Sequence, residues 1–499
     1  MTAEFEPQHL RVVVVGAGFG GLAAAHALKH QGEDFAVLER EQEVGGVWRD
    51  NTYPGCACDI PSNLYSLSFA PNPRWTRAFS PQSEIRDYLH RVARKHRLLP
   101  HIRFGCRLLE AAWDDTAQRW RIETSAGPLT ADVLIDGSGP IAEPSLPQLP
   151  GLDGFAGEVF HSARWNHDLD LAGRTVVVVG TGASAIQFVP AIQPVVGRMT
   201  VVQRTAPWVT PRMDRATTRI ERRLYAVVPW LQRLVRRRQY WMRELVMWKI
   251  MVSPRVRRTA TRAALWQLRR QVPDPALRKR LTPDWELGCK RILISNNWYP
   301  ALSAPNVEVV SAGIREVRAD SVVTTDGREH PADVIVFGTG FHVSDPPIAQ
   351  HLRGRDGRTL AECWNGNPHT YLGVTVTNFP NLFRLGGPGS ATGHNSHVFQ
   401  EECQVAYAMD ALRLMRARGI TSIEVRAAEQ RAYVGQQTAK LARTVWSVGG
   451  CQSFYQGTDG VAWGNWPDTT WKYRRLTRRF DPAPYQLRTT TTAVTPATN

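Results

Sequence analysis

The chain has 499 residues, of which 43% are hydrophobic, and a formal net charge of +16 at pH 7. This length suits two or three domains, and the hydrophobic fraction is ample for globular cores. No apolar run approaches 18 residues and no basic-then-apolar leader pattern opens the sequence, so we expect neither a membrane-spanning helix nor secretion, and place the protein in the cytoplasm.

The first predicted unit begins with a strand that runs into a glycine-rich turn. Four consecutive valines precede Gly16, Gly18 and Gly21, and an alanine-rich helical pattern follows. The first glycine permits a tight turn, and the second lets a pyrophosphate approach the backbone at the helix N-terminus. Glu39 ends the next predicted strand, where its carboxylate can accept both ribose hydroxyls and would repel a 2′-phosphate. We therefore expect this unit to bind FAD or NAD.

Seven cysteines are spread along the chain. Their odd number and wide spacing argue against a disulfide framework and fit a reducing cytoplasm. Cys56 and Cys58 are the only close pair, but one intervening residue is not the spacing of a dithiol redox motif, so we interpret them as incidental cysteines in a turn.

The same design repeats after a proline-rich stretch over 140–151, which indicates an interdomain linker. Another run of valines leads into a second turn, and the strand after it ends in Arg204 and Thr205 with no acid. Arg204 can pair with a 2′-phosphate through a charge-assisted fork, so this unit is expected to prefer NADPH. The residues of the second turn are Gly180, Thr181, Gly182, Ser184 and Ala185.

The positive charge gathers in residues 211–286, which hold 20 Arg or Lys and 6 Asp or Glu. No nucleic-acid motif accompanies it, so we expect no nucleic-acid partner. Five tryptophans and a helical spacing of apolar residues leave two interpretations open. One is a helical subdomain with a solvated basic face, and the other is peripheral contact with an anionic membrane.

The predicted fold class is α/β, with two Rossmann-like dinucleotide-binding domains and a basic helical insertion. Residues 1–150 are expected to form the first part of an FAD domain, and 151–340 an NADPH domain that contains the insertion 211–286. Residues 341–486 should return to the FAD domain, because a second closing strand and turn end at Gly340. Residues 487–499, rich in threonine, are expected to be a disordered tail.

Three features make the sequence resemble the class B flavoprotein monooxygenases, and within them the type I Baeyer–Villiger monooxygenases. The pattern FxGxxxHxxxW matches at Phe155, Gly157, His161 and Trp165. The pattern GGxWxxxxYPGxxxD matches at Gly45, Gly46, Trp48, Tyr53, Pro54, Gly55 and Asp59. The third feature is the pair Lys290 and Arg291. Trp165 favours this subgroup over the related N- and S-oxygenases, which usually carry another aromatic residue there.

The resemblance implies an enzyme that uses FAD, NADPH and O₂ to insert one oxygen atom beside a ketone carbonyl, through a C4a-peroxyflavin, giving an ester or lactone. Arg291 would be the fixed cation that stabilises the anionic species, with Asp59 orienting it. Lys290 would join Arg204 at the NADPH phosphate, while Gly46, Trp48 and Tyr65 would lie at the flavin. The loop 386–396 resembles the family's flavin-contacting loop. His161, although inside the signature, is expected to hold the hinge between the domains and not to act as a base.

One position departs from the family pattern. Where relatives often have a tryptophan that donates to the nicotinamide cofactor, this chain has Phe454, which has no donor. How firmly NADP⁺ is retained therefore stays open. The sequence does not define the ketone, although the aromatic insertion suggests a large apolar molecule. It does not define the oligomeric state either. The alternative functions are an N- or S-oxygenase on the same scaffold, a reductase-like flavoprotein, and an adaptor that binds membranes or polyanions.

Overall fold

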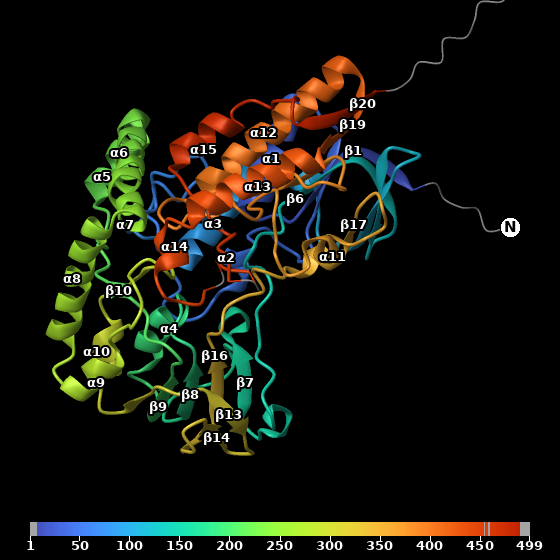
Figure 1. The fold of residues 1–499 in the computed structure, drawn as a ribbon. Coiled ribbons are helices and arrows are strands. Elements are labelled where there is room, and N and C mark those ends of the chain that lie inside the picture. Colours follow the sequence, from blue (N-terminus) through green and yellow to red (C-terminus); the bar gives the residue numbers. More distant parts are fainter. Residues whose placement is uncertain (1–6, 454, 458–459, 490–499) are drawn as a thin grey trace, which may run out of the picture.

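Two sheets, each with a glycine-rich turn after its central strand, form the two halves of the protein (Figure 1). The structure is a computed structural model that describes residues 7–453, 455–457 and 460–489. The predicted fold class is confirmed: two Rossmann-like units carry a helical insertion. Phe454 lies outside the described residues, so its expected effect on NADP⁺ stays a prediction.

The first sheet has eight strands, and β1 (Gln8–Val15) lies in its interior between β6 and β2. β2 (Phe35–Leu38) and β6 (Leu129–Asp136) flank β1 in parallel, and the valines of β1 are buried because helices and other strands cover both faces. Two strands from beyond residue 340, β17 and β18, pair with β4 and β6, so the chain returns to this sheet. The other strands are β3 (Ile102–Arg103), β4 (Leu108–Asp114), β5 (Arg119–Thr124), β17 (Leu352–Arg353) and β18 (Leu382–Arg384).

The second sheet has five parallel strands in the order β12-β9-β8-β16-β7. It repeats the arrangement of the first, since β8 (Thr175–Val179) is central, with β9 (Arg198–Val202) on one side and the closing strand β16 (Val334–Phe337) on the other. A small antiparallel sheet, β13-β14-β15, packs beside it. The remaining bounds are β7 (Glu158–His161), β12 (Val307–Val310), β13 (Ile314–Val317), β14 (Ser321–Thr324) and β15 (Glu329–Pro331).

Helix α1 (Phe19–Gln31) follows the first turn and packs along the long helix α12 (His397–Arg418). One buried apolar cluster includes Val14 of the first sheet and Val178 of the second, so the halves share a continuous core. The other helices outside the insertion are α2 (Val47–Asp50), α3 (Gln82–Lys95), α4 (Ala185–Ile192), α10 (Trp298–Leu302), α11 (Leu360–Trp364), α13 (Ala427–Leu441), α14 (Val445–Val448) and α15 (Thr470–Thr477), with 3₁₀ turns η1 (Leu99–His101), η2 (Leu152–Gly154), η3 (Ser162–Arg164) and η5 (Pro347–Gln350).

The insertion forms a column of helices along one side of the molecule, at the left of Figure 1. Strands β10 (Val209–Thr210) and β11 (Leu293–Ile294) pair in parallel where the chain enters and leaves it. Its helices are α5 (Arg219–Val227), α6 (Pro229–Met242), the π-helical turn η4 (Arg243–Met247), α7 (Trp248–Val252), α8 (Pro254–Gln271) and α9 (Pro275–Arg280). Within the described residues, no helix is both long enough and apolar enough to cross a bilayer.

Two sequence-based expectations are wrong in part. Residues 487–489, placed in a disordered tail, belong to strand β20 (Tyr485–Thr489), which pairs with β19 (Ile420–Val425) and so gives their backbone groups partners. The cysteines are not all free, since Cys289 and Cys451 form a disulfide across a sequence separation of 162. Cys56 and Cys58 are free and buried, in agreement with the incidental interpretation.

Candidate active site

The first glycine turn has the open backbone that a pyrophosphate needs. Gly16 has φ +91°, and a Cβ there would lie 2.8 Å from the carbonyl oxygen of Gly137. A Cβ on Gly21 would come within 1.8 Å of the Gly16 oxygen, whereas Gly18 faces only Gly46, whose own φ is +53°. Helix α1 has no side-chain cap and no acid in its first turn, so its N-terminal amides stay available to an anion. The turn therefore fits the pyrophosphate of FAD.

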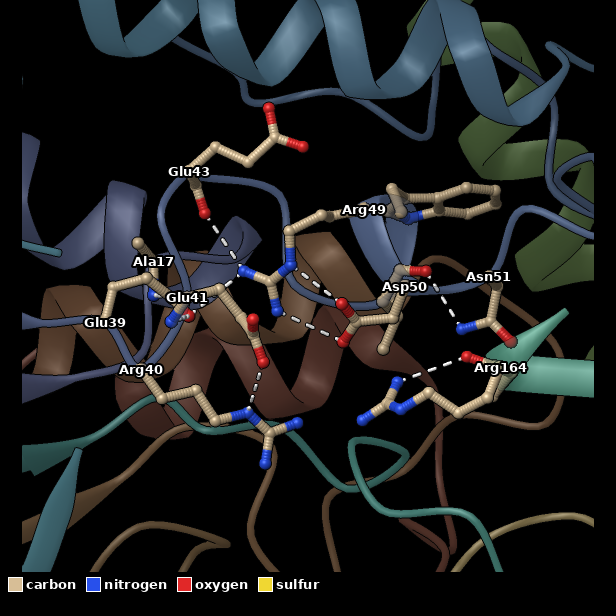
Figure 2. Close-up of polar contacts among 12 residues, drawn as sticks. Ala17, Glu39, Arg40, Glu41, Glu43, Arg49, Asp50, Asn51 and Arg164 are labelled. Carbon is tan, nitrogen blue, oxygen red and sulfur yellow. Dashed lines mark hydrogen bonds and ion pairs between the residues drawn. The ribbon is translucent and has the colours of Figure 1, made fainter. Parts of the chain in front are cut away.

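Glu39 lies at the end of β2, buried, with its carboxylate turned back toward the turn (Figure 2). Its Oε2 accepts the amide of Ala17 at 2.8 Å, and its Oε1 accepts the amide of Glu41 at 3.1 Å and Nη1 of Arg49 at 3.0 Å. A carboxylate has about four acceptor positions. Protein donors take three of these, so Glu39 retains capacity for one ribose hydroxyl more readily than for two.

Arg49, which the sequence patterns do not single out, holds this carboxylate in place. It lies between Glu39 and Asp50 in Figure 2, with Nε 2.7 Å from Asp50 Oδ1 and Nη1 bonded also to the carbonyl oxygen of Glu43. Arg49 lies inside the GGxWxxxxYPGxxxD stretch, but at a position where the pattern specifies no residue, so the pattern gave no reason to choose it. Arg49 thus fixes the orientation of Glu39 before any cofactor arrives.

The second glycine turn repeats the first and adds a cationic group. Gly180 has φ +104°, and its Cβ would lie 2.5 Å from the Gly338 oxygen, while α4 begins after Ser184 with no side-chain cap. Lys290 donates to Thr205 Oγ1 at 3.0 Å, close to Arg204. Burial and the charge of Arg204 lower the pKa of Lys290. Within the described residues neither cation forms a salt bridge, so the pair fits the 2′-phosphate of NADPH.

Arg291 and Asp59 meet at the junction of the two halves. Arg291 donates from Nε to Asp59 Oδ2 at 2.7 Å, and Nη2 lies 2.6 Å from the same oxygen. Burial alone would raise the pKa of Asp59, but the charges of Arg291 and Arg243 outweigh it and hold that pKa below its usual value. The charge of Asp59 in turn raises the pKa of Arg291. Both groups are therefore ionised, and about a third of the Arg291 side chain stays exposed.

Two further residues hold this pair, and neither was predicted. Arg243, in η4, donates to the backbone oxygen of Asp59 at 3.2 Å. Tyr455, buried, accepts a hydrogen bond from Arg291. The sequence offered no signal for Arg243, one of twenty cations in the insertion, whereas Tyr455 stood next to the position compared with the family loop.

The aromatic residues expected at the flavin contact each other. Trp48 donates from Nε1 to the hydroxyl of Tyr65 at 3.0 Å, and Phe19 of α1 meets the Tyr65 ring edge-on. This places both aromatics beside the first turn of α1, where they can pack on a flavin. Any hydrogen bond from Trp48 to the cofactor would have to replace the one to Tyr65.

The loop 386–396 is anchored by a buried carboxylate from the insertion. Glu244 accepts from Asn395 Nδ2 at 2.5 Å, and its Oε1 lies 3.3 Å from Nε2 of His394. Thr470 also hydrogen-bonds Glu244, through its hydroxyl and, at 3.0 Å, its amide. The insertion thereby fixes a loop that belongs to the first half.

Glu401 on α12 lies under the first turn of α1 and was not predicted. Its Cδ would be 3.4 Å from a Cβ on Gly20, and its Oε1 is 3.6 Å from His397 Nε2. Burial and the neighbouring charge of Glu402 raise the pKa of Glu401 to about 8, while burial lowers that of His397 to about 4. At neutral pH both are mostly uncharged, so Glu401 does not oppose an anion at this helix terminus.

The signature stretch forms β7, at the edge of the second sheet, and the turn that follows it. His161 pairs with Phe337 in the β7–β16 ladder, and its Nδ1 accepts the amide of Ala163 at 3.0 Å. Burial lowers the pKa of His161 to about 4. A Cβ on Gly157 would lie 2.2 Å from the Asp333 oxygen, so this position requires glycine. These contacts lie within the second half, so the hinge role of His161 stays a prediction.

The YPG turn of the second pattern docks on α4. The side-chain oxygen of Gln187 accepts hydrogen bonds from the amide of Ala57 and the hydroxyl of Tyr53, at 3.1 and 3.2 Å. A Cβ on Gly55 would lie 2.8 Å from the backbone oxygen of Gln187. A cavity of about 420 Å³ opens beside this contact. It is lined by residues such as Gln187, Arg212 and Asn296 and does not include Arg291 or Asp59.

Comparison with known proteins agrees with this geometry. The family model described as flavin-binding monooxygenase-like matches residues 9–354. A Baeyer–Villiger monooxygenase of Streptomyces coelicolor is 49% identical over 482 residues, covering 96% of this chain and 93% of that protein. One from Pseudomonas aeruginosa is 45% identical over 486 residues, covering 97% and 92%. The solved structure of cyclohexanone monooxygenase from Rhodococcus sp. Phi1 bound to NADP⁺ is 27% identical, with a TM-score of 0.87 and coverage of 97% and 100%.

Proposed function

The chain belongs to the flavin-binding monooxygenase-like family, and from this membership we propose that it is a Baeyer–Villiger monooxygenase that uses FAD and NADPH. It converts a ketone to an ester or lactone with one atom of O₂. The observation that carries the proposal is the ion pair between Arg291 and Asp59, which links two halves that each have a turn able to hold a dinucleotide. Because the halves share one core, NADPH held by the second half can reduce the flavin held by the first.

The residues divide between the two cofactors as the glycine turns do. Gly16, Gly18 and Glu39 would hold FAD, with the ring system against Trp48 and Tyr65. The second turn would hold the pyrophosphate of NADPH through Gly180, Thr181, Gly182, Ser184 and Ala185. Arg204, Thr205 and Lys290 would hold its 2′-phosphate. When bound, NADPH supplies a hydride and reduced FAD supplies oxygen in a form that attacks a carbonyl.

The protein's part in oxygen insertion is electrostatic. Negative charge develops on the ketone oxygen as the new bond forms, and a fixed cation in a site of low polarity stabilises it. Arg291 is that cation, since its charge is maintained by Asp59 and its direction by Asp59 and Tyr455. Arg243 holds the backbone of Asp59, so the arginine cannot turn away without breaking several contacts.

The test is product formation from ketones by the purified holoenzyme. Anaerobic NADPH should bleach the flavin absorbance, and readmission of ¹⁸O₂ should give an ester or lactone that carries one ¹⁸O atom. The ketone panel covers cyclic, aromatic, steroid and long-chain compounds. Hydrogen peroxide as the only product of oxygen reduction, with no ester from any ketone, would overturn the proposal.

The alternative is oxygenation of nitrogen or sulfur on the same scaffold, which does not need the same stabilisation of a carbonyl oxygen. Arg291→Ala separates the two functions, because ketone oxygenation should fall by a factor on the order of 10² or more while sulfoxidation falls far less. Arg291→Lys keeps the charge but loses the forked geometry of the guanidinium. Its ketone oxygenation should therefore fall less than that of Arg291→Ala. Equal losses of both activities would contradict the assignment.

A further inference from the structure

The outward face of the insertion has an unusual composition. Helices α6, η4 and α7 follow one another without a break, and from residue 230 to 252 their exposed positions recur every three or four residues, as one face of a helix does. Large apolar side chains dominate this face, with Trp230 64% and Leu245 58% exposed. The main apolar members are Trp230, Leu234, Trp241, Met242, Leu245 and Val246. The basic members are Arg233, Arg237, Arg238 and Lys249.

The inward face of the same helices is polar. Gln232 and Arg236 are turned toward the body of the protein, where they hydrogen-bond Asn72 and Ser66. The π-helical turn brings Arg243 and Glu244 inward together, the first to Asp59 and the second to the loop 386–396. A helix with a merely solvated basic face would bury its apolar residues and expose its charges. Here that arrangement is partly inverted, which argues against a merely solvated face.

Acidic side chains are scarce on this surface. Residues 229–272 contain twelve Arg or Lys, of which Arg236, Arg243 and Arg257 are turned inward, and a single acid, Glu244, which is 3% exposed. Helix α8 extends the surface with exposed arginines and with Trp266, 59% exposed, whose ring lies 5.4 Å from the guanidinium of Arg270. On α5 the apolar residues Ile220, Leu224 and Val227 are exposed at helical spacing.

We propose that this outward face of α5–α8 docks the protein on an anionic phospholipid bilayer. Contiguous exposed apolar side chains mark an interaction surface, because leaving them in water is unfavourable. Tryptophan and leucine flanked by arginine and lysine are typical of helices that lie in the plane of the membrane interface. Cations near an anionic surface are attracted to it, so the charge selects acidic lipid headgroups. The helices lie on the bilayer and do not cross it.

The docking face and the candidate active site are two sides of one column of helices. Leu245 and Val246 are exposed on the outside, while Arg243, two residues earlier, contacts the backbone of Asp59. An apolar ketone dissolved in the bilayer would therefore be concentrated close to the site. The docking itself does not depend on the proposed reaction and can be tested without any substrate.

The experiment is flotation of the purified holoenzyme with vesicles of phosphatidylcholine containing 30% phosphatidylglycerol, compared with vesicles of phosphatidylcholine alone. Wild type should float with the anionic vesicles and be released by 0.5 M NaCl, because salt screens the attraction. The variant Leu234→Glu/Leu245→Glu should bind at least tenfold more weakly. Its matched control is Leu109→Glu/Val195→Glu, which changes a leucine and a valine that are 47% and 53% exposed outside the insertion and should bind as wild type does.

Three outcomes would overturn the proposal. The first is no binding of wild type to anionic vesicles, and the second is equal binding of the two double variants. The third is a wild-type dimer in sedimentation velocity that the Leu234→Glu/Leu245→Glu variant dissociates, which would assign the face to a second copy of the chain. Flavin absorbance and the rate of NADPH oxidation without vesicles should be unchanged in both variants, which shows that each is folded.

Discussion

Arg291 donates to the carboxylate of Asp59 at 2.7 Å, although 232 residues separate them in the sequence. Asp59 follows the YPG turn of the first half, whereas Arg291 lies on the segment that leaves the helical insertion. The contact therefore exists only when the YPG turn is docked on α4 and the insertion is in place. Its geometry depends on the assembled protein and on no single domain.

Replacement of Asp59 by Asn tests this relationship. The amide keeps the size of the side chain but not its charge, so Arg291 loses the partner that fixes its direction. We expect kcat for ketone oxygenation to fall by about 10²-fold, in line with loss of a preorganised electrostatic group. Reduction of the flavin by NADPH, followed by stopped-flow absorbance, should change by less than a few-fold. A comparable loss in both half-reactions would mean that Asp59 acts on cofactor binding instead.

Replacement of Glu401 by Gln should flatten the dependence of stability on pH. The folded pKa of Glu401, about 8, lies above its unfolded value of about 4.3, so the folded protein holds an extra proton between these values. Its unfolding free energy therefore falls as pH rises across that window, by at most about 1.4 kcal/mol per pH unit. Thermal unfolding of the holoenzyme at pH 6 and pH 8 should show a smaller loss in Glu401→Gln than in wild type. Parallel losses would assign the dependence to other groups, such as the adjacent Glu402.

The sequence was sufficient for the parts of the site that rest on local pattern. Both glycine turns, Glu39 and Arg204 are defined by their distance from a strand, and the Lys290–Arg291 pair by the family resemblance. Arg243 and Tyr455 could not be found in this way, because what distinguishes them is a contact made across the folded chain. The same holds for the bond between Cys289 and Cys451, since odd cysteine number and wide spacing say nothing of proximity. The apolar residues of the insertion have the helical spacing that a buried face also has. The sequence alone therefore could not show that this face is exposed.

The preference for NADPH should depend on Arg204 and Lys290 together. Each single change to Ala removes one charge-assisted hydrogen bond to the 2′-phosphate, worth roughly 1.5–3 kcal/mol, and should weaken NADP⁺ binding by about 10- to 100-fold. Calorimetric titration of the holoenzyme with NADP⁺ and with NAD⁺ measures the two affinities. The affinity for NAD⁺ should change little, because NAD⁺ lacks the 2′-phosphate. An equal loss for both dinucleotides would contradict phosphate recognition. Arg174→Ala, a change at an exposed arginine just before β8 and at the end of that strand away from the glycine turn, is the control.

The disulfide between Cys289 and Cys451 should stabilise the segment that carries Tyr455. It joins the residue before Lys290 to the loop 449–465, across 162 residues of sequence. Cys451→Ser should lower the unfolding free energy by about 2–4 kcal/mol and speed proteolysis within the loop. Cys363→Ser, a change at a free cysteine, should have little effect. Mass spectrometry after alkylation without reductant tests the bond directly, and labelling of Cys289 in wild type would disprove it.

Replacement by alanine should have different effects at two neighbouring glycines, Gly154 just before the signature stretch and Gly157 within it. A Cβ on Gly157 would lie 2.2 Å from the backbone oxygen of Asp333, whereas a Cβ on Gly154 meets nothing within 4 Å. Since Asp333 lies next to β16, which pairs with β7, Gly157→Ala must shift that strand pairing and with it the register of His161. We expect Gly157→Ala to destabilise the protein by several kcal/mol, a large effect for one methyl group, and Gly154→Ala to stay within about 0.5 kcal/mol of wild type. Denaturant unfolding of both variants measures the difference. If the signature stretch is the hinge predicted from the sequence, NADPH oxidation uncoupled from ester formation should rise only in Gly157→Ala.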